Sequence, residues 1–277
     1  MIPFDFEYYR PDSIKEAVDV FYTLKNDGKS PVYYGGGSEL ISMARVGNAS
    51  FDAVVDIKNV PECRAMGAEN GKLILGSALT LSDISESRLF PLMEKTGGRI
   101  ADHTMQCKIT LGGNLASSII YRETVLPLLL SDAKLTVANR DGIREYNMSQ
   151  TFRERLLLQS GDLLVRAAVA MEYTTAPFIH VKKTKNEKID YPLITAAALK
   201  KDGFIRIAFS GLASFPFRDC GLENILNDGS LSFRERALKI GESLNGIYLN
   251  DLSGSSEYRK FVLMNTLENI LETMKDR

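Results

Sequence analysis

The chain has 277 residues, of which 44% are hydrophobic and 25% are charged, and its formal net charge is -1. This length corresponds to one large domain or to two or three small ones, each able to bury a core. A charge so close to zero argues against a protein that binds nucleic acid by neutralising phosphates. No apolar run approaches the ~20 residues of a membrane-spanning helix, and the opening MIPFDFEYYRPDS lacks the apolar core of a signal peptide.

Cysteine and histidine are scarce. The cysteines Cys63, Cys107 and Cys220 lie far apart without a CxxC pair, and the only histidines are His103 and His180. This argues against an iron–sulfur cluster or a Cys/His zinc site held by this chain, so we expect no metal ligands. An odd number of cysteines is typical of a reducing compartment, and we expect a cytoplasmic location.

The first part of the chain predicts helices alternating with short strands. Ser13 and Glu16 have capping-box spacing, and apolar residues follow at helical intervals, which predicts a helix over 12–26. The apolar run at 31–34 leads into Gly35-Gly36-Gly37, which predicts a strand ending in a glycine loop. Further along we expect strands at 54–57 and 72–76 and a helix that begins after Thr80.

From residue 133 the pattern predicts mainly strands. The segments 135–137 and 143–145 flank Asn139-Arg140-Asp141-Gly142, as in a hairpin. Strands are also expected at 162–171 and 178–183, and at 196–199 and 204–209 around the turn Lys201-Asp202-Gly203. Amphipathic helices are expected at 233–245 and 256–274, preceded by an exposed connection over 218–232. Together these elements indicate an α+β protein with a boundary near 174–177.

Several common catalytic motifs are absent. The chain has no GxxxxGK[ST], HExxH or GxSxG, and no GxGxxG follows a predicted strand. His103 and Cys107 are four residues apart, so a helix would place both on one face, as in a thiolate pair. Because no third orienting group is evident, a partly buried histidine near an unrelated thiol is the favoured interpretation.

Two glycine clusters, at 34–40 and 110–117, carry the main functional signal. Successive glycines let backbone N–H groups point the same way and let a ligand approach the main chain. Ser38, Thr110 and Ser117 add hydroxyl donors. For each cluster alone, an ordinary tight turn is the favoured interpretation. Two such loops facing each other would instead bind a pyrophosphate without many basic side chains.

The ordered motifs resemble one known family. They are RPDSIKEA at 10–17, GGGSEL at 35–40, GSALT at 76–80, TLGGNLA at 110–116 and SEYRK at 256–260. This set resembles the FAD-binding (medium) subunit of molybdenum hydroxylases, the xanthine dehydrogenase and carbon monoxide dehydrogenase type, over nearly the whole chain. Departures from the family pattern are Gln106-Cys107 in place of Arg-Asn, Ile119-Ile120 in place of Ser-Pro, and no iron–sulfur insertion.

The resemblance implies an α+β fold of the vanillyl-alcohol-oxidase type. It predicts two subdomains that bind FAD, followed by a C-terminal three-stranded antiparallel sheet with helices. The corresponding ranges are 1–58 for the first FAD-binding subdomain, 59–175 for the second and 176–277 for the C-terminal flavoprotein domain.

The resemblance also implies a set of cofactor-binding residues and no catalytic side chain. Glu123 stands where the family usually has an aspartate that contacts ribityl or ribose hydroxyls. A strand lysine near the flavin ring would be Lys182 or Lys183; the spacing leaves the choice open, and we take Lys183 as the candidate. The full set is Val32, Tyr33, Tyr34, Gly35, Gly36, Gly37, Ser38, Glu39, Leu40, Thr110, Gly112, Gly113, Asn114, Ser117, Glu123, Leu164 and Lys183.

Aromatic and basic side chains near these positions have two interpretations. For Tyr33, Tyr34, Phe178 and Tyr191, core packing is favoured over contact with the flavin ring for each alone. For the lysines at 182, 183, 185 and 188, the favoured interpretation is a solvated strand edge and turn. The alternative is contact with a partner subunit or with a nicotinamide dinucleotide phosphate.

The function implied by the resemblance is electron transfer. A molybdopterin-binding large subunit and a 2Fe-2S small subunit would be the partners, and electrons would pass through FAD to NAD+ or another acceptor. A stand-alone FAD-dependent oxidase or reductase of the same fold type is the alternative, with His103 or His180 as its only imidazole base. A third hypothesis is a non-enzymatic interaction protein whose glycine loops are only turns. No nucleic-acid or membrane partner is expected.

Overall fold

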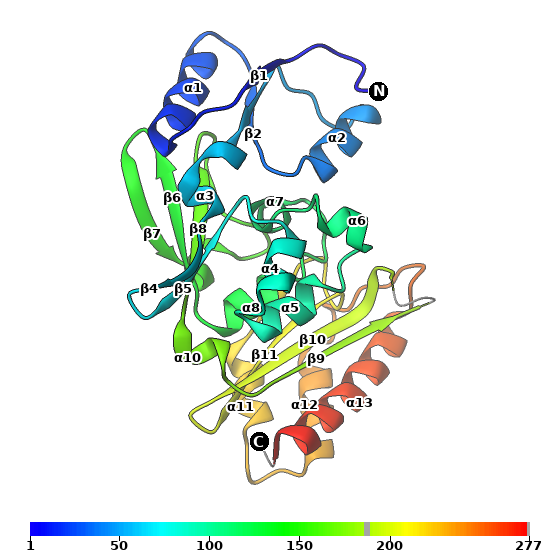
Figure 1. Ribbon diagram of the computed structural model, residues 1–277. Helices are drawn as coiled ribbons and strands as arrows, with labels where there is room; N and C mark the ends of the chain where they lie inside the picture. Colours follow the sequence, from blue (N-terminus) through cyan, green and yellow to red (C-terminus); the bar gives the residue numbers. More distant parts are fainter. Residues whose placement is uncertain (186–188, 276–277) are drawn as a thin grey trace.

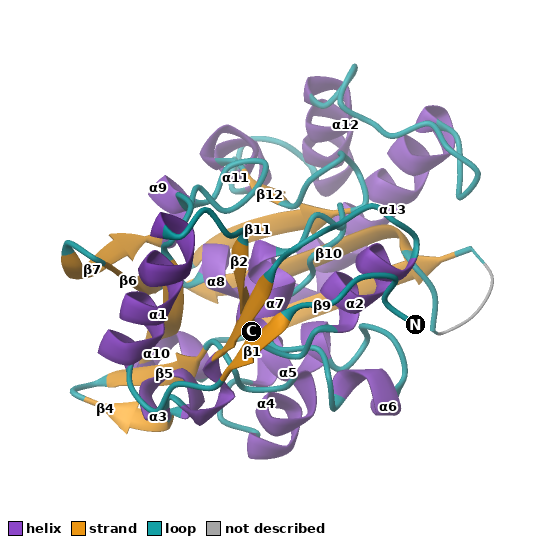
Figure 2. Cartoon of the chain, turned by 90° about the horizontal axis from the view of Figure 1, so that it is seen from above, coloured by secondary structure: helices purple, strands orange, loops and turns teal. Residues whose placement is uncertain are grey.

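The computed structural model describes residues 1–185 and 189–275. Within these residues the strands form three sheets, built from successive parts of the chain and arranged from top to bottom in Figure 1. Helices and strands are intermixed throughout (Figure 2), which confirms the α+β prediction.

The N-terminal sheet is parallel, with the strand order β1-β3-β2. The predicted helix at 12–26 is confirmed, because Ser13 caps the N–H of Glu16 and four apolar residues face the sheet. The elements of this part are β1 (Glu7–Tyr9), α1 (Ile14–Asn26), β2 (Pro31–Tyr34), α2 (Ser38–Arg45), β3 (Ala53–Asp56), the 3₁₀ turn η1 (Ile57–Asn59) and α3 (Pro61–Arg64).

The middle sheet is antiparallel, with the order β4-β5-β8-β6-β7. Thr80 and Asp83 form the capping box predicted at the start of α4, and the predicted hairpin joins β6 to β7. The elements are β4 (Met66–Glu69), β5 (Lys72–Gly76), α4 (Leu81–Ser87), α5 (Pro91–Gly97), α6 (His103–Gln106), α7 (Leu111–Ala116), α8 (Val125–Leu130), β6 (Lys134–Asn139), β7 (Gly142–Asn147), α9 (Met148–Thr151), β8 (Leu163–Ala170) and α10 (Met171–Thr174).

The C-terminal sheet is antiparallel as expected, but the described chain gives it four strands rather than three, in the order β12-β11-β10-β9. The extra strand has two residues, too few to show an alternating pattern in sequence. The elements are β9 (Phe178–Thr184), β10 (Pro192–Lys201), β11 (Phe204–Ser210), β12 (Phe217–Arg218), α11 (Cys220–Leu226), α12 (Phe233–Ser243) and α13 (Ser256–Lys275).

The connection at 218–232 is not simply exposed. It contains α11, whose Leu222 and Leu226 are buried against the C-terminal sheet and whose first turn is capped by Asp219. The two amphipathic tail helices are confirmed as α12 and α13. Neither α13 nor any other helix of the described chain has the length and apolar character to cross a membrane.

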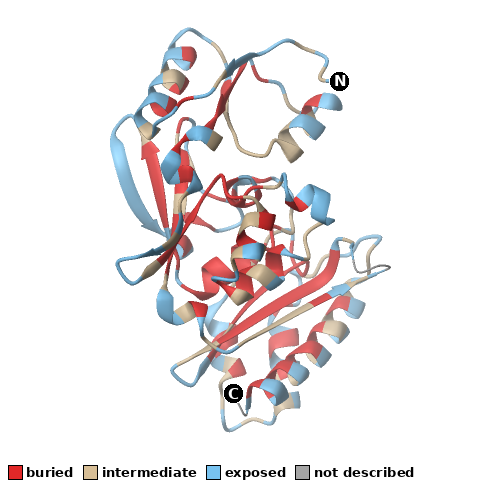
Figure 3. Cartoon of the chain, in the orientation of Figure 1, coloured by how far each residue is buried: buried red, intermediate tan, exposed pale blue. Residues whose placement is uncertain are grey.

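Strand β10 is buried on both faces, as its red colour in Figure 3 shows. Because side chains alternate along a strand, Ile194, Ala196 and Ala198 pack toward α12 and α13. Ala197 and Leu199 pack toward α8 and the middle sheet. The C-terminal sheet therefore lies between the tail helices and the rest of the protein (Figure 1).

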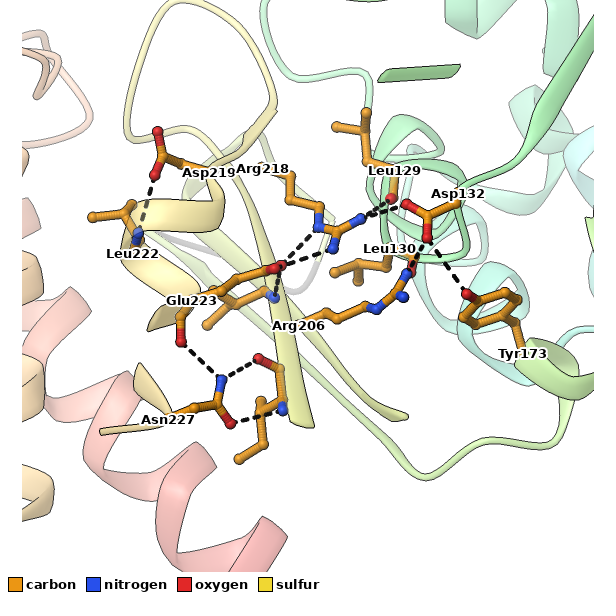
Figure 4. A network of polar contacts seen from close by, with 12 residues as sticks. Leu129, Leu130, Asp132, Tyr173, Arg206, Arg218, Asp219, Leu222, Glu223 and Asn227 are labelled. Carbon is orange, nitrogen blue, oxygen red and sulfur yellow. Dashed lines mark hydrogen bonds and ion pairs between the residues drawn. The ribbon is translucent and has the colours of Figure 1, made fainter. Parts of the chain in front are cut away.

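A charged network fastens the end of α8 to this sheet (Figure 4). Arg206 donates to the carbonyl of Leu130 at 2.9 Å, and Arg218 donates to the carbonyl of Leu129 at 2.8 Å. Both guanidinium groups also pair with Asp132, at 2.5 and 2.7 Å. These contacts satisfy carbonyl groups that the helix itself leaves unpaired.

The predicted domain boundaries at 58/59 and 175/176 fall between strands of different sheets. The cores are shared across them, since Leu163 and Val165 of β8 pack with α1 and Ala197 of β10 packs with α8. The exact boundaries stay a prediction.

Candidate cofactor site

Both predicted glycine loops line one cavity of about 1130 Å³. The loops are in direct contact: a Cβ added to Gly35 would lie 2.7 Å from Thr110 Oγ1, and one added to Gly36 would lie 1.5 Å from the carbonyl oxygen of Lys108. Only glycine permits this approach. Small-molecule pockets typically measure roughly 300–1,000 Å³, so the cavity has room for a ligand as large as a dinucleotide.

The first glycine loop ends at the N-terminus of α2. Gly37 has a left-handed backbone with φ 71° and no side chain to cap the helix, and residues 38–40 line the cavity. The first N–H groups of a helix have no partner within it and carry a partial positive charge. This helix end can therefore bind the phosphate groups of a ligand.

Glu39 joins α2 to the segment after the second glycine loop. Its carboxylate accepts hydrogen bonds from Ser117 Oγ, from the N–H of Ser118 at 3.0 Å and from Ser118 Oγ at 2.5 Å. The carboxylate is thus engaged by the protein, and it fixes the two sides of the cavity relative to each other.

Glu123 and Lys182 form a buried ion pair in the wall of the cavity. Their side chains are 4% and 2% exposed, and Lys182 Nζ lies 2.7 Å from Glu123 Oε2. Thr195 Oγ1 donates to the other carboxylate oxygen at 2.7 Å, and Lys182 also donates to the carbonyl of Arg99. Burial raises the pKa of Glu123, while the ammonium of Lys182 acts in the opposite direction.

The structure places Lys182, not Lys183, at the cavity. Alternation along β9 puts Lys182 on the face toward α8, opposite Thr195, whereas Lys183 points to the other face with Ile179 and Val181 and is exposed. The choice of Lys183 is therefore corrected to Lys182 on the geometry. Lys182 is also too buried for the solvated edge expected of the lysine run, and Lys188 lies outside the described residues.

Most of the other predicted residues come together at the cavity. Three do not line it: Val32 packs in the core under α2, Leu164 is buried in the middle core, and Gly112 packs against Ser77. A Cβ on Gly112 would lie 2.7 Å from Ser77 Cβ, so this glycine serves backbone packing. The predicted residues that line the cavity are Tyr33, Tyr34, Gly35, Gly36, Gly37, Ser38, Glu39, Leu40, Thr110, Gly113, Asn114, Ser117 and Glu123.

His103, the first residue of α6, and Cys107, which follows the helix, lie close together but outside the cavity lining. His103 Nε2 is 3.8 Å from Cys107 Sγ, and Ser82 Oγ is 3.2 Å from the same sulfur. Among the described residues, no three His, Cys, Asp or Glu side chains are grouped so as to hold a metal ion.

Comparison with known proteins identifies the family. Residues 4–169 match the family described as the FAD binding domain in molybdopterin dehydrogenase. The chain belongs to this family. The FAD-binding subunit of xanthine dehydrogenase from Escherichia coli O157:H7 is 26% identical over 274 residues, with 92% of this chain and 89% of the relative covered. The carbon monoxide dehydrogenase medium chain of Hydrogenophaga pseudoflava is 31% identical over 120 residues, or 42% and 41% of the two chains.

Solved structures agree on the fold. Carbon monoxide dehydrogenase from Hydrogenophaga pseudoflava superimposes with a TM-score of 0.86 at 22% identity, over 98% of both chains. Quinoline 2-oxidoreductase from Pseudomonas putida 86 gives 0.83 at 20% identity, over 98% of this chain and 96% of that one. The protein is therefore an FAD-binding oxidoreductase subunit of the molybdenum hydroxylase family.

The residues present fit FAD. The cavity volume and the uncapped N-terminus of α2 are what a ligand with a pyrophosphate requires, and the glycines at 35 and 36 let the two loops that line the cavity pack together. The buried ammonium of Lys182, paired with Glu123, also lines the cavity.

Part of the cavity lining was missed from the sequence. The segment 100–109 contributes apolar side chains, Arg122 is buried against Ser117, and Tyr121 stacks on Tyr191 with ring centroids 4.9 Å apart. Tyr191 is exposed, so the core-packing interpretation was wrong for this residue. These positions carry no local motif. The alternation along the strand at 178–183 was the one signal that separated Lys182 from Lys183.

Proposed function

We propose that this chain is the FAD-carrying electron-transfer subunit of a molybdopterin-containing hydroxylase. The observation that carries the proposal is one cavity in which two interlocked glycine loops, the open end of α2 and the Lys182–Glu123 pair meet. FAD bound there would supply the redox chemistry, taking electrons from 2Fe-2S clusters and giving them to NAD+ or another acceptor.

The partners are proposed from the names of the relatives. One relative is a subunit of the 6-hydroxypseudooxynicotine dehydrogenase complex of Paenarthrobacter nicotinovorans, and another is a medium subunit of nicotine 6-hydroxylase from the same organism. By analogy, a molybdopterin-binding large subunit and a 2Fe-2S small subunit would assemble with this chain.

The residues have distinct roles in this proposal. Backbone N–H groups at 38–40 would bind the pyrophosphate, with hydroxyl donors from Thr110 and Ser117. Lys182 would supply positive charge beside the cofactor, and Glu123 would hold that ammonium in place. Apolar side chains of 100–109 would exclude water.

The cavity favours electron transfer over a stand-alone oxidase. An oxidase would need a general base within reach of its substrate. Among the lining residues that the structure describes there is no histidine. The lining carboxylates are engaged by the protein: Glu39 by Ser117 and Ser118, Glu123 by Lys182 and Thr195, and Asp190 by the N–H of Tyr191, which donates to Asp190 Oδ1 at 2.7 Å.

The direct test is flavin content and its reduction. The purified full chain should be yellow, release FAD on denaturation and bleach with NADH in the absence of oxygen. Gly36→Ala should abolish FAD retention, because its Cβ would overlap a carbonyl oxygen. Gly229→Ala is the matched control, since nothing lies within 4 Å of its Cβ, and it should retain FAD. A colourless wild-type protein that takes up no FAD would contradict the proposal.

Co-purification distinguishes the two flavoenzyme hypotheses. Molybdenum and iron–sulfur subunits that accompany the chain from its native source support the proposal. A solitary chain that oxidises a substrate by itself would support the stand-alone oxidase.

A further inference from the structure

A row of polar side chains crosses the C-terminal sheet beneath the cavity. In the register of the sheet Thr195 lies opposite Lys182 of β9 on one side and opposite Ser210 of β11 on the other. All three are buried, and they are on the face of the sheet that packs toward α8. The rest of this face is occupied by small and apolar residues such as Ala197 and Ala208.

This row holds the segment that leads into α8. Ser210 Oγ donates to the carbonyl of Tyr121 at 2.6 Å. Lys182 and Thr195 reach Glu123 together, each at 2.7 Å and each at a different carboxylate oxygen. The C-terminal sheet thereby determines where the side chain of Glu123 lies.

Thr195 differs from its two partners in position. Its side chain is fully buried and does not line the cavity, whereas Glu123 and Lys182 do. A hydroxyl that donates to a buried carboxylate stabilises the charged form. Without it, Glu123 Oε1 would lose its donor and the carboxylate would be free to rotate away from Lys182.

We infer that Thr195 is a positioning residue of the cofactor cavity: its hydroxyl holds Glu123 against Lys182, so that the side chain of the lysine keeps its place at the wall. The inference rests on the proposed function, because it concerns how the cavity receives FAD. Thr195 acts only through Glu123, and the charges that face this carboxylate are Lys182 of β9 and Arg99 of the loop after α5.

The experiment measures FAD affinity of the full chain by flavin fluorescence between pH 6 and 9. Thr195→Val should weaken binding by about tenfold, the loss expected for a hydrogen bond to a charged group. It should also change how affinity depends on pH, because the protonation of Glu123 moves to higher pH. Thr195→Ser, which restores the hydroxyl, should recover both affinity and pH profile.

Two comparisons separate positioning from general stability. Thr266→Val makes the same exchange at a buried threonine of α13 whose hydroxyl bonds only the carbonyl of Val262, and it should leave affinity and pH profile unchanged. In a Glu123→Gln background, Thr195→Val should have less than about a third of its effect, because residues that act through one another are not additive. A full effect there, or an unchanged pH profile in Thr195→Val, would overturn the inference.

A second readout does not depend on FAD. Infrared absorption of protonated carboxyl groups is followed against pH in the FAD-free full chain, and the band lost in Glu123→Gln is assigned to Glu123. Thr195→Val should move its appearance to higher pH. If the wild-type chain binds no FAD but the band moves in Thr195→Val, the proposed function fails, while the inference that Thr195 positions Glu123 stands. If FAD binds and the band stays, only the inference fails.

Discussion

The C-terminal sheet holds α8 at both ends, but with different chemistry at each. Before the helix, Glu123 pairs with Lys182 in a setting that is almost fully buried. After the helix, Asp132 is 50% exposed and pairs with Arg206 and Arg218. An acidic group before a helix and cations at its end both suit the helix dipole, so both ends are favourable, and they differ in access to water.

The difference indicates which end serves the cofactor. Desolvating an ion pair is costly, and a buried pair often stabilises a fold no better than apolar residues would. Asp132 itself does not carry this cost, since it is half-exposed to water, although Arg218 of the same network also pairs with the buried Glu223. At the cavity wall, where a ligand could use the charge, we propose that the buried pair of Glu123 and Lys182 serves the cofactor.

The largest expected effect comes from breaking the buried pair. Lys182→Met leaves Glu123 as an uncompensated buried carboxylate, so the free energy of unfolding should fall by about 3–5 kcal/mol and FAD affinity should fall with it. Urea denaturation of the FAD-free and FAD-loaded chain measures both effects. The double variant Glu123→Gln/Lys182→Met removes both charges and should regain most of the stability but not the affinity. A single variant within about 1 kcal/mol of wild type would contradict this view of the pair.

A somewhat smaller loss of stability is expected from a change in the network after α8. Arg218→Met removes two contacts to Glu223, at 2.7 and 3.0 Å, and leaves that buried carboxylate with the N–H of Ile207 as its donor. Stability should fall by about 3 kcal/mol, because a buried charge loses its partner. FAD affinity should stay within about twofold of wild type, since the network does not line the cavity. A tenfold loss of affinity would show that the two ends are coupled.

Acid should destabilise the fold through His180 of β9, which lies two residues from Lys182. Burial, aided by Arg99, Lys182 and Lys95, lowers the pKa of His180 from 6.5 to about 4. Between these values the unfolded chain binds the proton and the folded chain does not, so stability falls as the pH drops. The loss from this residue between pH 7 and 5 should be about 2 kcal/mol, and His180→Gln should remove it from the slope of stability against pH. An identical slope in the variant would show that His180 is not responsible.

The sequence predicted the elements better than their assembly. Periodicity and capping identified α1, α4 and the hairpins, because these depend on residues close in the chain. The two-residue β12 was missed, since its pairing with β11 and its bonds from Arg218 to α8 involve distant residues. Helix α11 is missed in the sequence because it has only seven residues and begins with Cys220 and Gly221, which are weak helix formers.

For the site, the glycine loops were predictable and the buried pair was not. Repeated glycine marks close backbone approach, and Gly36 against Lys108 is such a case. The pairing of Glu123 with Lys182 and Thr195 depends on the register of β9 with β10, which no local pattern determines. Resemblance supplied Glu123, and only the strand geometry distinguished Lys182 from Lys183.

The smallest effect is expected at Asp132, and it tests the solvent-exposed side of the comparison most directly. The residue has a left-handed backbone with φ 48°, a conformation that asparagine also accepts, so Asp132→Asn changes the charge with little backbone strain. An exposed ion pair contributes about 0–1 kcal/mol and is screened by salt. The loss in stability should therefore stay below about 1 kcal/mol and shrink further when urea titrations are repeated in 0.5 M salt. The loss in stability of Lys182→Met in the same titrations should change little with salt, because a buried charge is poorly screened. If Asp132→Asn instead cost as much as Lys182→Met and ignored salt, Asp132 would behave as a buried charge, and the acidic residues before and after α8, Glu123 and Asp132, would no longer differ in their access to water.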